Sequence, residues 1–123
     1  MMVQKSSYSL LAAVPLAALL GLIGCTGVFA TQVESTLGPN AGADDHMAAS
    51  MLYQAKAQQL AAEADRYETA ALKIGPYEDL KGFRRAGLRI AVQEKRGEAN
   101  QLEELYAVHY EKAQTMYGKK NPD

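Results

Sequence analysis

The 123-residue sequence is poor in the residues that mark disulfide-rich or nucleic-acid-binding domains. It has one cysteine and no tryptophan, so a disulfide within the chain is excluded. Its 13 basic side chains are balanced by 14 acidic ones. Domains that bind nucleic acid usually carry a basic excess, and we therefore expect no nucleic-acid partner. The length allows one domain and argues against two.

The motifs of common enzyme classes are also missing. The sequence has no glycine-rich phosphate loop, no serine elbow and no histidine pair at metal-hydrolase spacing. Its carboxylates fall on the charged faces of predicted helices, where a general acid or base lacks a desolvated pocket. We therefore predict a protein that is not an enzyme.

Apolar residues make up 48% of the chain, but they are unevenly distributed. Residues 1–24 hold 16 of them and a single charge, Lys5. The apolar run at residues 10–23 is shorter than the ~20 residues that a transmembrane helix needs. Together with the polar segment before it, the run predicts a cleaved signal peptide over residues 1–24.

The run ends in Leu22-Ile23-Gly24-Cys25, which resembles the signal of bacterial lipoproteins. The resemblance implies that the Cys25 thiol carries a diacylglyceryl group and becomes an acylated N-terminus. It also implies a lipid anchor, and the absence of aspartate after the cysteine favours the outer membrane, facing the periplasm. The alternative is ordinary cleavage after Ala30, which gives a secreted periplasmic protein.

The rest of the chain divides into three parts. Residues 25–43 carry one charge and no persistent period, so we predict a flexible tether. Residues 44–118 show helical periodicity throughout, and we predict a helical hairpin there. We expect residues 119–123 to form a disordered tail.

Two heptad-like seams define the predicted helices, at about residues 45–74 and 78–117, on either side of Gly75-Pro76. Gly82 and Gly87 leave open a break near the start of the second helix. The first seam comprises Tyr53, Ala57, Leu60, Ala64, Tyr67, Ala71 and Ile74. The second comprises Leu88, Val92, Lys95, Ala99, Leu102, Tyr106, His109, Ala113 and Met116.

The predicted fold class is all-α, an antiparallel two-helix hairpin. After residue 24 the chain has 26 apolar residues larger than alanine, too few for one hairpin to bury a stable core alone. We therefore predict completion of the core by dimerisation into a four-helix bundle. Residues 44–118 resemble small helical-hairpin proteins of the cell envelope, a resemblance that assigns no functional residue.

Both histidines lie on the seams, and a turn centred near Tyr77 places His46 opposite His109. With Asp45 and Met47 beside them, these residues form a candidate copper or zinc site. Two alternatives remain: a buried histidine pair hydrogen-bonded to Asp45 or Tyr106, or a pH-sensitive contact.

A second candidate site lies in residues 81–96, which hold six basic residues and one acidic residue. Lys81, Arg85 and Arg89 are spaced four apart and would form one stripe on a helix, suited to an anionic polymer, lipid headgroup or acidic protein. The alternative is a solvated face balanced by acidic residues of the first helix: Glu63, Asp65 and Glu68.

From these features we predict a non-enzymatic, membrane-anchored lipoprotein that acts as a structural or adaptor element of the bacterial cell envelope. Its partners would be the membrane, through the lipid on Cys25, and a second copy or another helical envelope protein. We expect no cofactor besides that lipid. The alternative function is extracytoplasmic binding of copper or zinc through His46 and His109.

Overall fold

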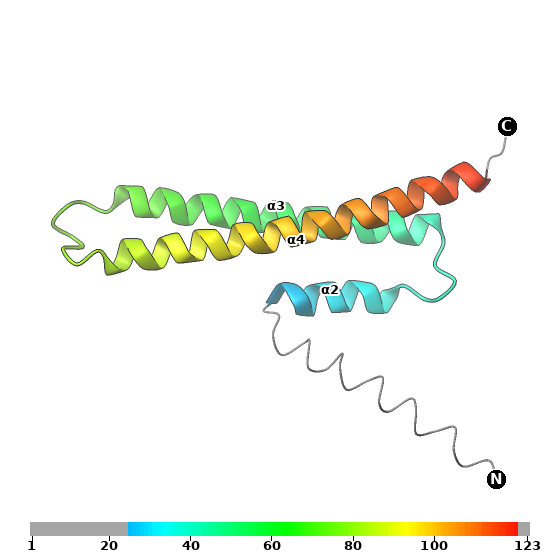
Figure 1. The fold of residues 1–123 in the computed structure, drawn as a ribbon, viewed down its shortest axis with the longest axis horizontal. Helices are drawn as coiled ribbons and strands as arrows, with labels where there is room; N and C mark the ends of the chain where they lie inside the picture. The colour runs from blue at the N-terminus through cyan, green and yellow to red at the C-terminus, as the bar shows by residue number, and fades with distance from the viewer. Residues whose placement is uncertain (1–24, 121–123) are drawn as a thin grey trace, which may run out of the picture. The chain divides into compact units, whose positions relative to one another are not determined.

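The computed structural model describes residues 25–120, which contain three helices and no strand (Figure 1). They are α2 (Cys25–Thr36), α3 (Ala43–Lys73) and α4 (Phe83–Lys120). The all-α prediction is thus confirmed. Of the described residues, 25–36 belong to one unit and 37–120 to a second.

Among the described helices, none is long and apolar enough to cross a membrane. The predicted signal peptide, including Leu22-Ile23-Gly24, lies outside the described residues, as does the side chain of Cys25. Residues 121–123 of the predicted tail also lie outside them.

In the second unit, α3 and α4 pack along each other as an antiparallel hairpin (Figure 1). Their interface is a single stripe in which alanines alternate with larger residues, so the two backbones approach closely. Tyr53 and Leu102 are its largest fully buried apolar side chains. The other buried apolar residues of the two helices are Ala49, Ala57, Leu60, Ala64, Val92, Ala99 and Ala113.

The predicted seams are therefore confirmed in the middle of the hairpin, and they loosen toward the turn. Two residues of the predicted seam are not buried: Tyr67 is exposed and Ala71 is half-buried. Two helices alone bury only a narrow stripe, and side chains at its margin keep one side in solvent. Ile74 is the last buried apolar residue before the turn.

Residues 25–36 form helix α2, so the prediction of an irregular tether is wrong for this part of residues 25–43. The hydroxyl groups of this segment bond back to the helix. Thr31 donates to the carbonyl of Gly27, and Thr36 donates to that of Val33. Such bonds satisfy the hydroxyl groups within the helix. The connection to α3 turns at Gly38, whose carbonyl accepts from the Ala41 amide at 3.1 Å.

The boundaries of the second hairpin helix also differ from the prediction of residues 78–117. Gly82 has φ +71°, a left-handed conformation that glycine adopts without steric cost, and α4 begins directly after it. The helix then continues through Gly87 without a break and includes Lys119 and Lys120. The predicted disordered tail is therefore wrong for these two residues. Their positive charges stabilise the last turn, because they lie at the negative end of the helix dipole.

Candidate functional site

His46, near the start of α3, and His109, on α4, are brought together as predicted. Both side chains are buried, at 6% exposure each. Their Nδ1 atoms lie 3.0 Å apart, and the rings stack with centroids 5.2 Å apart and planes 19° from parallel. Residues 63 positions apart in sequence thus form one contact, here called the histidine pair.

Tyr53 extends the histidine pair into a column of three rings. It follows His46 by seven residues, two helical turns, and so lies on the same face of α3. Its fully buried ring stacks on His109 with centroids 5.6 Å apart and an interplanar angle of 23°. Sequence analysis placed Tyr53 on the seam but did not connect it with the histidines, although the shared heptad position was the available signal.

The geometry of the histidine pair limits its protonation. A hydrogen bond between two Nδ1 atoms requires one ring to donate and the other to accept. The pair can therefore be neutral or carry one positive charge. If both rings were fully protonated, two N–H groups would face each other across the contact and the hydrogen bond would be lost.

The other two predicted metal ligands are engaged elsewhere. Asp45 is exposed, and its Oδ2 accepts from the backbone N–H of Gly42 at 2.9 Å, which caps the start of α3. The Met47 sulfur lies 3.6 Å from the hydroxyl of Ser50. Within residues 25–120, no group of three or more His, Cys, Asp or Glu side chains could hold a metal ion. The predicted four-ligand site is therefore not assembled, and the two histidine rings contact each other.

A second contact joins the helices at the same end of the hairpin. The Tyr117 hydroxyl on α4 donates to the carboxylate of Asp44 on α3 at 2.5 Å. This hydrogen bond raises the pKa of Tyr117, because the negative carboxylate stabilises the protonated phenol. Sequence analysis missed this pair, although Asp44 and Tyr117 flank the predicted histidine register.

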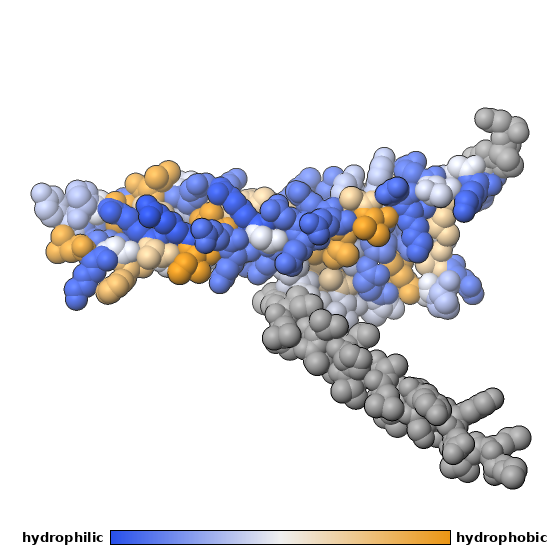
Figure 2. Space-filling model, viewed as in Figure 1, coloured by the Kyte–Doolittle hydropathy of each residue, from blue (hydrophilic) through white to orange (hydrophobic). Residues whose placement is uncertain are grey.

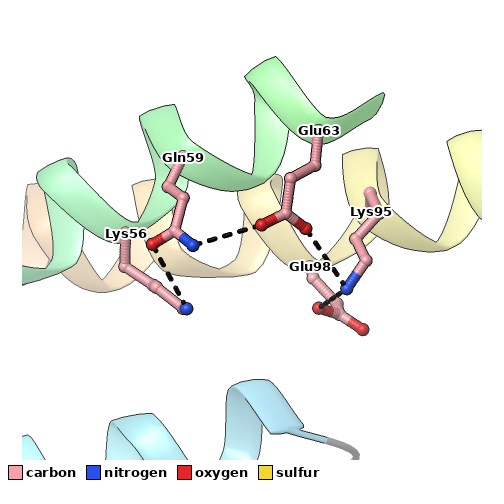
Figure 3. Close-up of polar contacts among 5 residues, drawn as sticks. All are labelled: Lys56, Gln59, Glu63, Lys95 and Glu98. Carbon is pink, nitrogen blue, oxygen red and sulfur yellow. Dashed lines mark hydrogen bonds and ion pairs between the residues drawn. The ribbon is translucent and has the colours of Figure 1, made fainter. Parts of the chain in front are cut away.

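Charged groups bridge the middle of the hairpin (Figure 3). Lys95 on α4 lies 3.7 Å from Glu63 on α3 and 3.9 Å from Glu98 on its own helix. Glu63 in turn accepts from the amide of Gln59, whose oxygen lies 3.4 Å from Lys56. Lys95 can therefore lie half-buried beside the seam, because its ammonium group is paired with the carboxylates of Glu63 and Glu98.

Arg96 makes equivalent contacts with the other predicted acids of α3. Its guanidinium lies 2.5 Å from Glu68 and 3.5 Å from Asp65. The hydrogen bond to Glu68, together with the charges of both acids, raises the pKa of Arg96. Lys95 and Arg96 are thus balanced by acidic residues of α3, as the alternative to a binding stripe predicts.

The basic stripe predicted from Lys81, Arg85 and Arg89 does not form on one helix. Lys81 lies in the turn before α4, so the helical spacing does not apply to it. Arg85 donates through Nη2 to the carbonyls of Ile74 and Gly75, at 2.9 and 3.1 Å. It therefore satisfies the carboxyl end of α3 and is not a free cation of a stripe.

Asp79 performs the reciprocal task at the start of α4. Its carboxylate accepts from the backbone N–H groups of Arg84 and Arg85, at 3.2 and 2.9 Å. The hydrogen bond from Arg85 N–H lowers the pKa of Asp79 most, and burial opposes it only in part. Because Gly82 has no side chain to cap the helix, Asp79 does so from three residues earlier.

Comparisons of the chain with models of protein families, with curated proteins and with solved structures found no match. Any function must therefore be inferred from the side chains described above. These are the two facing imidazoles at the open end of the hairpin and the basic residues of the turn, where Asp79 and Arg85 make hydrogen bonds to the backbone.

Proposed function

We propose that the chain is a non-enzymatic, lipid-anchored lipoprotein whose helical hairpin acts as a structural or adaptor element of the bacterial cell envelope. The observation that carries the proposal is Cys25, the only cysteine, which directly follows Leu22-Ile23-Gly24 at the end of an apolar run. The hairpin suits a spacing role, since α3 with 31 residues spans about 45 Å.

A second copy is the partner that the hairpin best supports. Several large apolar residues of α3 and α4 lie outside the buried stripe and are about half exposed: Met51, Leu52, Ile90, Val108 and Tyr110. Two hairpins that covered these residues would form the four-helix bundle expected from the composition. Sedimentation equilibrium of the mature chain tests this, and a stable monomer at micromolar concentration would contradict it.

The anchor is tested by labelling expressing cells with radioactive palmitate and by mass spectrometry of the processed chain. We expect label on the wild type and a mass that corresponds to acylated Cys25. Cys25→Ala should abolish both, whereas the matched control Ser35→Ala should retain them. Label on the Cys25→Ala variant, or a mature chain that starts at Thr31, would contradict lipidation, and the second result would support ordinary secretion.

Metal binding is the second candidate function, and the facing Nδ1 atoms favour it. Two imidazole nitrogens bound to one zinc ion at about 2.0 Å lie about 3.3 Å apart when the geometry is tetrahedral. The observed separation of 3.0 Å needs little change to reach that arrangement. Copper could be bound by the same nitrogens.

Calorimetric titration of the mature chain with zinc and copper salts tests this function. We expect one ion per chain, and no binding at the same site for His46→Ala or His109→Ala. Asp45→Asn is the matched control, since Asp45 caps α3 and is not a ligand in the structure. A dissociation constant weaker than about 10 µM, or binding unchanged by His109→Ala, would exclude it.

A further inference from the structure

Large apolar side chains in and beside the turn between α3 and α4 are mostly exposed, and Figure 2 shows orange, apolar groups interspersed with blue ones at this end of the hairpin. Here "the tip" means residues 72–84. Leu72, Tyr77, Leu80 and Phe83 are 83, 88, 82 and 74% exposed. Isolated exposed apolar residues are common, but four within twelve positions form a patch that the packing of the hairpin does not use.

The tip and the first residues of α4 after it concentrate unpaired positive charge. Residues 73–89 contain five basic residues and two acidic ones, in a chain whose net charge is −1. Asp79 and Arg85 are used inside the turn. Within residues 25–120, no ion pair involves the four other basic side chains of this segment, in contrast to Lys95 and Arg96. These four are Lys73, Lys81, Arg84 and Arg89.

We propose that the tip binds the surface of an anionic lipid bilayer. Leu72, Leu80 and Phe83 would enter the boundary between headgroups and acyl chains, and Tyr77 would lie at headgroup level, where its ring and hydroxyl are both accommodated. Lys81 and Arg84 would contact anionic headgroups, since basic residues are attracted to such surfaces. Their long aliphatic stems let them do so while the apolar neighbours are immersed.

Charge and shape together favour a bilayer over a folded protein as the occupant. The patch lies at the protruding end of the hairpin and mixes apolar with basic residues, the combination that is typical of interfacial membrane segments. The inference deepens the proposed function and rests on it only for the cellular location. The chain enters the hairpin at Gly42, at the other end of α3, so the tip would be a second lipid contact distinct from the anchor.

Vesicle co-sedimentation tests the proposal with the mature chain, residues 25–123, carrying Cys25→Ser so that no acyl group contributes. This chain contains all of the described residues. We expect binding to phosphatidylcholine vesicles that contain phosphatidylglycerol, and binding at least about tenfold weaker to pure phosphatidylcholine. Raising the salt concentration should weaken the binding, because the headgroup attraction is screened.

Two double variants separate the apolar and basic contributions. Leu80→Ser with Phe83→Ser should weaken binding at least about tenfold, while the control Val28→Ser, at an exposed apolar position of α2, should not. Lys81→Gln with Arg84→Gln should weaken it by about fivefold per charge removed. Lys112→Gln with Lys119→Gln is the matched control. All of these side chains are exposed, so circular dichroism should show that each variant remains folded.

Insertion itself is tested by Tyr77→Trp, whose fluorescence should shift to the blue when anionic vesicles are added. Equal binding to neutral and anionic vesicles, equal effects of tip and control variants, or no fluorescence shift would overturn the proposal. If the tip variants instead change the sedimentation mass and leave vesicle binding intact, the tip is a contact between two copies. None of these outcomes depends on whether Cys25 is acylated in cells.

Discussion

The two ends of the hairpin place their large side chains differently. At the open end, His46, His109 and Tyr53 turn inward and stack, and Tyr117 donates to Asp44 across the helices. At the turn, large apolar residues point outward. The end joined only by side chains is thus held by buried rings, whereas the end joined by the backbone can leave its apolar groups exposed.

Replacing a ring at the open end should have the largest effect. Tyr53→Ala removes a fully buried side chain and its stack on His109, and should lower the free energy of unfolding by about 3–5 kcal/mol. Leu80→Ala at the tip should change it by less than about 0.5 kcal/mol, since little is buried there. Urea denaturation of both variants checks the contrast, and equal losses would refute it.

A smaller loss is expected when the brace at the turn is broken. Asp79→Ala leaves the first N–H groups of α4 without their acceptor, and should lower the melting temperature by about 5 °C. Glu78→Ala is the matched control, with little expected change.

The contribution of Asp79 to stability depends on pH. Because the pKa of Asp79 is lowered in the folded chain, its contribution is complete above the ordinary value of 3.8. It is lost as the pH falls through the lower folded value. The difference in melting temperature between wild type and Asp79→Ala should therefore disappear below that pH, and a difference that persists in strong acid would argue against the brace.

Much of the hairpin was predictable because a heptad pattern fixes which face of a helix is buried. The turn near Gly75-Pro76 then fixed which residues meet, and the contact between His46 and His109 followed from that register. Met47 and Asp45 were placed with the histidines by proximity in sequence alone. Proximity does not show where a side chain is engaged, and Asp45 is engaged by the backbone of Gly42.

The turn and α2 could not be predicted in detail, because they depend on contacts that leave no periodic trace. Asp79 caps α4 from outside the helix, and Arg85 reaches back to the end of α3. The second helix was predicted to begin at residue 78, but it begins at Phe83, after the turn that these two contacts hold. Arg85 binds the end of α3 and therefore does not belong to the predicted stripe. The exposure of Leu80 could not be predicted either, because hydrophobic periodicity indicates burial only within helices and strands and Leu80 lies in the turn.

The position of the histidine pair has a consequence for how the chain folds. The turn forms contacts between residues 5 to 11 positions apart, whereas the histidines are separated by 63 positions. Closing a longer loop costs more chain entropy, so the hairpin should nucleate at the turn and zip toward the open end. The histidine contact would then form late, and substitutions there should accelerate unfolding while leaving the folding rate nearly unchanged.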